Sequence, residues 1–261
     1  MKTMLVAAAA AALFTGTTLA SSGTKPTVVL VHGAFADASS WNGVISRLAS
    51  DGYRVIAVAN PLRSVHGDAQ YVTGIVNGVQ GPVVLVGHSY GGAVISAVHS
   101  PNVRALVYVG AFAPDTAETA FDLSAKFPGS TLGQALAAPV ALGDGSHDLY
   151  IEQEKFHDQF AADVPASDTI NMAAGQRPVT DAALNEALPG EPAWKSIPSW
   201  FIYGDQDRNI PPQVLAFMAE RAKSRHTEAV RGASHVVMIS HPQAVAKVIG
   251  LAAATVATAV Q

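Results

Sequence analysis

The sequence contains no cysteine, and this absence excludes several kinds of chemistry at once. A thiol nucleophile, a cysteine-ligated zinc site, a disulfide framework and a lipidated N-terminal cysteine all require that residue. Any catalysis by this chain must therefore rest on oxygen and imidazole groups.

Charge is also scarce. Only 14% of the residues are charged, and the formal net charge of −4 has no concentrated acidic or basic block behind it. This pattern indicates neither a nucleic-acid-binding surface nor a polybasic membrane anchor. We therefore expect a neutral small molecule as the partner; the composition leaves the oligomeric state open.

Hydrophobic residues make up 49% of the 261 residues, which is enough for one sizeable core. Residues 1–20 have the layout of a secretory signal peptide: Lys2 is the one charge, an apolar run covers 4–14, and small residues stand at Thr18 and Ala20. We expect removal of this segment and export to the periplasm or beyond, with no stable membrane anchoring afterwards. An uncleaved anchor is the alternative.

The central motif is the pentapeptide from Gly87 to Gly91, which has the pattern Gly-x-Ser-x-Gly. It directly follows the apolar run 82–86 and precedes a helix-permissive run at 92–99. A sharp turn between a strand and a helix exposes the serine hydroxyl, and it needs residues without bulk two positions before and after the serine. We predict that Ser89 is a nucleophile in such a turn; an ordinary strand–helix turn is the alternative.

Apolar runs of strand length alternate with helical patterns along most of the chain. The expected strands cover 27–32, 54–59, 82–86, 103–109, 199–203 and 226–230. The expected helices cover 39–50, 68–79, 92–99, 212–223 and 242–255. The alternation predicts an α/β fold with a mostly parallel sheet of about six strands flanked by helices, in one domain spanning 24–261.

The alternation stops between about 113 and 195, where the sequence is polar and rich in proline and glycine. Helical patches occur there at 116–126, 149–162 and 180–188. We interpret this stretch as an inserted helical cap over the active site. Its histidine and acidic residues follow no metal-binding motif, so we expect no metal site.

Two loops after late strands carry the candidates for a base and an acid. His235 follows the last strand and Asp207 follows the fifth, and the order serine, aspartate, histidine is the one this fold uses. His241 is the rival base. Asp205 is the rival acid, or else a turn or capping residue.

An oxyanion hole needs two backbone N–H donors. We expect them at Tyr90 and Ala34, with Phe35 as the second choice for the latter. Phe35 and Phe112 are candidates for binding the substrate, together with Tyr90, although aromatic residues near strand ends also serve as core. His32 is expected to make a structural hydrogen bond, and the side chain of His88 is expected to point away from the nucleophile.

Four motifs together resemble the α/β-hydrolase superfamily, in particular the branch that includes plant methylesterases and hydroxynitrile lyases. They are 29–34 with Trp41, 87–92, 207–211 and 232–235. The resemblance implies the same acid and base, because the family's carboxylate precedes an Ile-Pro pair and its histidine follows a Gly-Ala turn. It also separates reactions: such lyases carry threonine where this chain has Gly33 and lysine where it has Val236. A serine at position 89 argues against dehalogenase and epoxide hydrolase chemistry.

These observations predict an exported serine hydrolase that cleaves carboxylic esters of small, largely apolar molecules through an acyl-enzyme. Ser89 would attack, His235 would transfer the proton, and Asp207 would hold the imidazolium. The expected reaction needs no cofactor. The alternatives are a lactonase or other specialised hydrolase with the same triad, a hydroxynitrile lyase-like enzyme, and a non-catalytic ligand-binding protein on the same fold.

Overall fold

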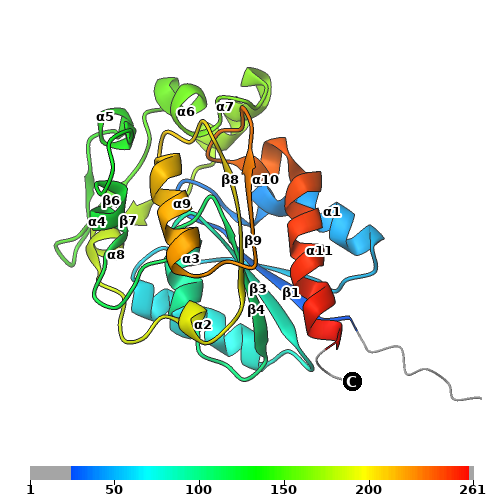
Figure 1. Ribbon diagram of the computed structural model, residues 1–261. Helices are drawn as coiled ribbons and strands as arrows, with labels where there is room; N and C mark the ends of the chain where they lie inside the picture. Colours follow the sequence, from blue (N-terminus) through cyan, green and yellow to red (C-terminus); the bar gives the residue numbers. More distant parts are fainter. Residues whose placement is uncertain (1–24, 259–261) are drawn as a thin grey trace, which may run out of the picture.

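The computed structural model describes residues 25–258, and the predicted signal peptide lies outside the described residues. A six-stranded sheet in which all neighbouring strands are parallel forms the centre (Figure 1). Its strands, in spatial order, are β2 (Val55–Val58), β1 (Thr27–Val31), β3 (Val83–His88), β4 (Val103–Val109), β8 (Ser199–Gly204) and β9 (His226–Val230). The predicted fold class and sheet are therefore confirmed.

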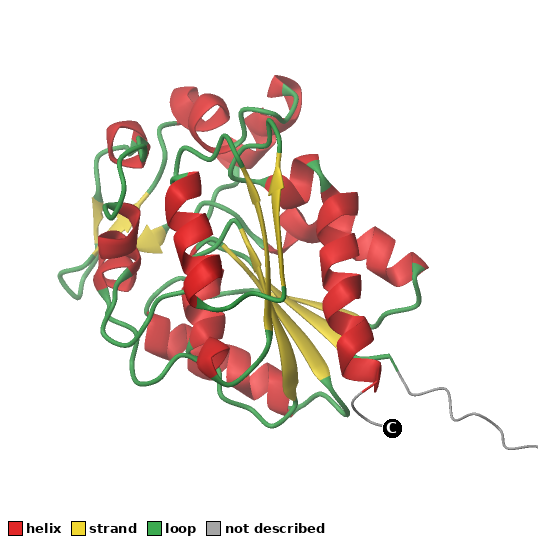
Figure 2. Cartoon of the chain, in the orientation of Figure 1, coloured by secondary structure: helices red, strands yellow, loops and turns green. Residues whose placement is uncertain are grey.

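The sheet is covered by helices on both faces, as Figures 1 and 2 show. One face carries α1 (Asn42–Ser50) and α11 (Pro242–Thr258), which also pack on each other. The other face carries α2 (Val65–Asn77), α3 (Tyr90–Ser96) and α9 (Pro212–Arg221). The central strands β1, β3, β4 and β8 are buried between the two helical layers and have little contact with water, which is why their sequences are largely apolar.

Several helix boundaries differ from the prediction, and at α2 the reason is a capping residue. Helix α2 begins at Val65 rather than at 68, since the Ser64 side chain accepts a hydrogen bond from the Gly67 N–H and caps the helix. A short 3₁₀ helix, η1 (Ala38–Trp41), precedes α1, and the Asp37 side chain caps it by accepting the Ser39 N–H. Helix α3 begins at Tyr90, directly after the serine of the pentapeptide.

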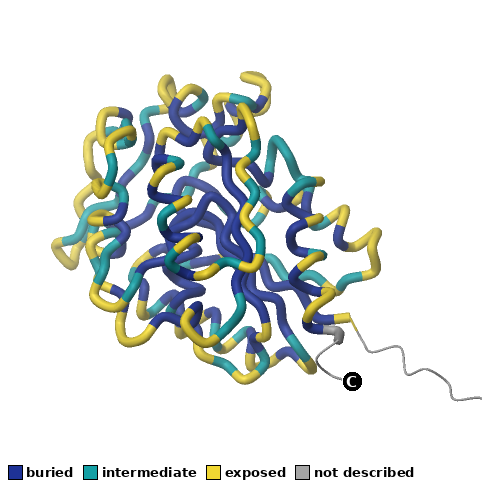
Figure 3. The backbone as a smooth tube through the Cα atoms, viewed as in Figure 1, coloured by how far each residue is buried: buried dark blue, intermediate teal, exposed yellow. Residues whose placement is uncertain are grey.

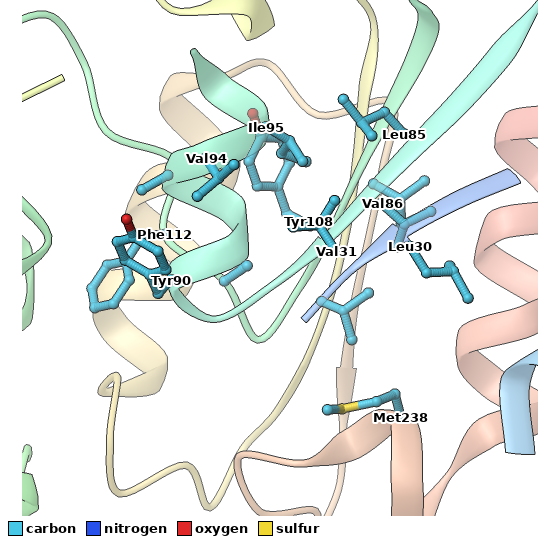
Figure 4. Packing of buried hydrophobic residues seen from close by; sticks show 14 of the residues in the cluster. Leu30, Val31, Leu85, Val86, Tyr90, Val94, Ile95, Tyr108, Phe112 and Met238 are labelled. Carbon is cyan, nitrogen blue, oxygen red and sulfur yellow. The ribbon is translucent and has the colours of Figure 1, made fainter. Parts of the chain in front are cut away.

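Figure 3 shows that the buried residues concentrate in the centre of the molecule, along the strands. Figure 4 shows residues from this core: Leu30 and Val31 of β1 and Leu85 and Val86 of β3 lie among side chains of the neighbouring elements. The strand register pairs Val31 with Gly87. This pairing brings the carboxyl ends of β1 and β3 level with each other, at the edge where a parallel sheet places its site.

The segment between β4 and β8 contains more structure than the three helices expected from the sequence. Its helices are α4 (Ala120–Ser124), α5 (Leu132–Ala135), α6 (Gln153–Phe160), α7 (Ala166–Ala174), α8 (Asp181–Asn185) and the 3₁₀ turn η2 (Ala193–Lys195). It also forms a small antiparallel sheet of β5 (Val140–Ala141), β6 (His147–Leu149) and β7 (Val179–Thr180). The sequence pattern missed these strands because two or three residues are too few to show an alternation.

This inserted segment contacts the loops that follow β1, β8 and β9. The Phe35 N–H donates to the Arg177 carbonyl oxygen, and the Thr131 N–H donates to that of Arg208. The Ser234 hydroxyl donates to the Asp163 carboxylate. The segment therefore lies over the carboxyl ends of the strands.

A short helix that the sequence did not predict, α10 (Val237–Ser240), follows the β9 loop. Within residues 25–258, no helix combines the length and apolar character needed to cross a membrane.

Candidate active site

The pentapeptide forms a strained turn between β3 and α3. Ser89 has φ 52° and ψ −124°, a backbone conformation that L-residues rarely adopt. Glycine is required on both sides: a β-carbon at Gly87 would lie 2.6 Å from the Gly91 carbonyl oxygen, and one at Gly91 would lie 2.6 Å from that of Val31. The turn predicted from the spacing is therefore present, with Ser89 at its tip.

Asp207 and His235 form a buried pair. Asp207 Oδ2 lies 2.7 Å from His235 Nδ1, and both side chains are almost completely inaccessible to solvent. The other oxygen, Asp207 Oδ1, accepts the N–H groups of Asn209 and Ile210 at 2.8 and 2.9 Å. A carboxylate fixed in this way only accepts, so it holds the proton of His235 on Nδ1 and leaves Nε2 as the free basic nitrogen.

His235 Nε2 is buried and has no hydrogen-bond partner among residues 25–258. No hydrogen bond joins it to Ser89 Oγ among these residues, so the structure brings together the predicted acid and base but does not close the third link. His235 lies close to the nucleophile turn, because its ring packs near that of His88, the residue before Ser89. The centroids of the two rings are 4.8 Å apart.

The rival acid and base have other partners. Asp205 Oδ1 accepts the Gly232 N–H at 2.7 Å, which ties the loop after β8 to the loop after β9. This contact agrees with the turn role considered for Asp205. His241 Nδ1 lies 2.9 Å from Ser240 Oγ and 3.5 Å from the Asp163 carboxylate. The structure therefore places His235, and not His241, against Asp207.

The loop after β1 lies against the nucleophile turn. A β-carbon at Gly33 would lie 2.6 Å from Ser89 Cβ and 3.2 Å from Tyr90 N. In the described part of the chain, the N–H groups of Ala34 and Tyr90 have no hydrogen-bond acceptor, whereas the Phe35 N–H donates to Arg177 at 2.9 Å. Ala34 and Tyr90 are thus free to donate to a ligand, and Phe35, the second choice for this role, is not.

Two buried histidines support the site without facing it. His32 Nε2 accepts the Asn60 N–H at 3.1 Å, which is the structural hydrogen bond expected for His32. Burial lowers the pKa of His32 and brings the pKa of His88 well below 6.5. His88 is therefore neutral, and its Nε2–H donates to the His235 carbonyl oxygen at 3.2 Å. The sequence did not indicate this link between the nucleophile turn and the base loop.

A cavity of about 200 Å³ opens beside Ser89. Phe35 and Phe112, the predicted substrate-binding residues, line it, as does Tyr90. Figure 4 shows Tyr90 and Phe112 near the start of α3. The inserted segment supplies most of the remaining wall, including Leu132, Leu136, Leu149 and Leu184. None of the described residues that line the cavity is charged.

Phe160 is a site residue that sequence reasoning missed. It comes from α6 in the inserted segment, and its ring lies 5.2 Å from the His235 ring and 6.1 Å from the Phe35 ring. It is completely buried. The available signal was the pair Phe156 and Phe160, four residues apart on one face of a short helix, which no catalytic motif distinguishes from ordinary core.

The profile of the alpha/beta hydrolase family matches residues 28–248. An alpha-hydroxynitrile lyase of Arabidopsis thaliana is 24% identical over 246 residues, which cover 82% of this chain and 92% of that protein. A pimeloyl-[acyl-carrier protein] methyl ester esterase of Neisseria meningitidis serogroup B is 26% identical over 243 residues, which cover 84% of this chain and 89% of that protein.

Among solved structures, polyneuridine aldehyde esterase superimposes with a TM-score of 0.74 at 19% identity. The superposition covers 87% of this chain and 98% of that one. At this level of identity the likeness concerns the fold. It extends along nearly the whole length of the esterase.

Proposed function

The chain belongs to the alpha/beta hydrolase family, and on that premise we propose that it is a serine hydrolase of carboxylic esters. The observation that carries the proposal is the state of His235. Asp207 holds its Nδ1 proton, and its Nε2 is buried near the nucleophile turn without a partner among the described residues. A buried nitrogen of this kind lacks a hydrogen bond that the Ser89 hydroxyl would supply. The methyl ester esterase among the relatives supports the same reaction.

The proposed mechanism uses the groups at the strand ends. Ser89 Oγ attacks the ester carbonyl carbon while His235 Nε2 takes its proton, and Asp207 stabilises the resulting imidazolium. The N–H groups of Ala34 and Tyr90 donate to the oxyanion of the tetrahedral intermediate. His235 then protonates the leaving alkoxide, and water cleaves the acyl-enzyme by the same steps.

The cavity favours small, largely apolar substrates. Its volume of about 200 Å³ is below the roughly 300–1,000 Å³ of most ligand pockets. The described residues that line it are mostly aliphatic or aromatic, and none is charged. A free carboxylate or ammonium group on the substrate would therefore lose its hydration without gaining a partner of opposite charge. We propose a neutral ester with a short acyl group.

A hydroxynitrile lyase is the second candidate, because one relative has that activity. Two positions favour the hydrolase. The β-carbon of a threonine at position 33 would overlap Ser89, and position 236 holds a completely buried valine instead of lysine. Release of cyanide from a cyanohydrin by the purified protein, at a rate comparable to ester hydrolysis, would reverse this preference.

Hydrolysis rates on a panel of lactones, compared with those on esters, separate a lactonase from an esterase.

Export remains part of the proposal. It rests on the charge and hydropathy of residues 1–20 in the sequence. N-terminal sequencing of the secreted protein should begin after Ala20, whereas an intact Met1 on protein recovered outside the cytoplasm would contradict cleavage.

The direct test of the hydrolase assignment replaces Ser89 by alanine. We expect kcat on a short-chain p-nitrophenyl ester to fall by at least about 10⁴-fold, as in other serine hydrolases that lose the nucleophile. Ser50→Ala is the control and should keep full activity, because Ser50 is exposed and its hydroxyl donates within α1, to the Ser46 carbonyl oxygen. Full activity of the Ser89→Ala protein would end the proposal.

A further inference from the structure

The side chain of Asn209 borders the cavity at a position set by the acid loop. Asn209 stands two residues after Asp207, and its N–H is one of the two that bind the Asp207 carboxylate. Only 4% of the residue is exposed, yet it lines the same cavity as Ser89. The loop that positions the acid therefore also places an amide in a largely apolar wall.

Neighbouring groups determine which way the Asn209 amide is turned. Gln159, from α6 of the inserted segment, places Nε2 at 3.0 Å from the Arg208 carbonyl oxygen. A carbonyl oxygen only accepts, so this atom of Gln159 must be the NH₂ group. The same NH₂ lies 2.7 Å from the Asn209 side chain, and the atom it meets must be the acceptor, Oδ1. Thr131 Oγ1 completes the arrangement by donating to Gln159 Oε1 at 2.8 Å.

Asn209 Nδ2 is consequently the group without a partner. It has no hydrogen-bond acceptor among residues 25–258. Unlike the buried side-chain atoms that lack a partner, it is not sealed from solvent. The other polar side chains of the wall, apart from Ser89, already donate within the protein. They are Tyr90 to Asp68, Ser124 to Phe121, Ser130 to the Asn209 carbonyl and Asn185 to Asp181.

We propose that Asn209 determines specificity by donating from Nδ2 to an oxygen of the substrate other than those of the ester group. The substrates are then neutral esters or lactones whose acyl part carries an ether, alkoxy or keto oxygen. This inference rests on the proposed ester hydrolysis. An alkyl substrate in this cavity would remove water from the amide without replacing its hydrogen bond, which is costly in a low-dielectric site. A site built to bond one polar atom therefore rejects the analogue that lacks it.

The test compares p-nitrophenyl esters in pairs of equal size. Methoxyacetate is paired with butanoate, 3-methoxypropanoate with pentanoate, and 4-methoxybutanoate with hexanoate, so that the oxygen occupies successive positions. The measured quantity is kcat/KM for the oxygenated ester divided by kcat/KM for its alkyl partner. Dividing the wild-type ratio by the ratio for a variant cancels the different intrinsic reactivity of the two esters.

Two variants remove the donor in different ways. Asn209→Leu removes the whole amide, and Asn209→Asp keeps an acceptor for Gln159 while replacing Nδ2 by an oxygen. For at least one pair we expect the wild-type ratio to exceed both variant ratios by about tenfold, which corresponds to about 1.4 kcal/mol. Asn185→Leu is the matched control at the same cavity: one N–H of its Nδ2 donates to the Asp181 carbonyl oxygen at 2.9 Å, and the residue is exposed, so water can accept from the other. Its ratio should equal that of the wild type.

A third variant tests the orientation. Gln159→Leu leaves Asn209 in place but removes the group that turns its amide, so the ratio should fall toward that of Asn209→Leu. Equal ratios in the wild type, Asn209→Leu and Asn209→Asp for all three pairs would overturn the inference, and hydrolysis of these esters would leave the esterase proposal intact. Absence of hydrolysis of every ester, together with no labelling of Ser89 by a fluorophosphonate, would overturn both.

Discussion

Gly33 is a position where one added methyl group should damage the proposed chemistry. The residue lies in the loop after β1, directly before Ala34, whose N–H is one of the two proposed oxyanion donors. Gly33→Ala changes no charge and removes no hydrogen-bonding group. Any effect of this substitution therefore comes from the space that the β-carbon occupies.

The structure sets the size of that effect. The new β-carbon would lie 2.6 Å from Ser89 Cβ and 2.7 Å from the His88 carbonyl oxygen. Carbon atoms in contact are normally about 3.5–4.0 Å apart, so the loop or the nucleophile turn must move by about 1 Å. Displacements of that size cost about 100-fold in rate, and loss of an oxyanion donor costs about 10²–10³-fold in kcat. Overpacking adds a stability cost of about 1–3 kcal/mol.

The assay measures kcat and KM on a short-chain p-nitrophenyl ester, and urea unfolding checks stability. Gly74→Ala is the matched control: Gly74 lies within α2, and a β-carbon there would meet no atom within 4 Å. That variant should keep wild-type activity and gain about 0.5–1 kcal/mol in stability. A Gly33→Ala protein with wild-type kcat/KM would refute the reasoning about the loop.

Two further predictions concern pH. Burial lowers the pKa of His32 and of His88 below 6.5, so below that pH the unfolded chain binds protons that the folded chain does not. The free energy of unfolding, measured with urea, should therefore fall as the pH drops below 6.5. Each histidine contributes a slope of about 1.4 kcal/mol per pH unit until the pH reaches its folded pKa, and the slope should be shallower in His88→Gln. A flat profile would contradict this. Burial raises the pKa of Glu118, but hydrogen bonds from Arg221 and the Asp115 N–H outweigh it, and the net pKa lies below 4.5. The stability that the Glu118 carboxylate contributes is present above pH 4.5 and is lost as the pH falls through its folded pKa. Glu118→Gln should therefore lower Tm more at pH 7 than at pH 4. Equal changes in Tm would contradict a lowered pKa for Glu118.

Most of the main sheet could be predicted because β1, β3, β4 and β8 are largely apolar runs of five to seven residues. Burial between two helical layers makes such runs conspicuous in the sequence. The edge strands are less distinct: β2 has four residues, and β9 is partly exposed and begins with His226, Thr227 and Glu228. The strands β5, β6 and β7 could not be found in the same way, because they contain two or three residues and are formed by tertiary pairing. Local pattern carries too little information at that length.

The candidate site divides along similar lines. Asp207 and His235 could be located because each follows a strand by a short loop, and parallel strands bring such loops to one edge. The contacts of Gln159 and Phe160 with the site could not be predicted from the sequence. They depend on where the inserted segment packs, and Gln159 meets Asn209, which is 50 residues away along the chain. No local motif records a contact of that kind.

The most direct measurement of the central claim is covalent labelling of the protein with a fluorophosphonate, followed by peptide mapping. The proposed mechanism predicts a single adduct on Ser89, absent from Ser89→Ala and formed at a strongly reduced rate in His235→Gln, because the hydroxyl is a poor nucleophile without its base. Ester hydrolysis by the wild-type protein with no adduct at Ser89, or with the label on another residue, would contradict it.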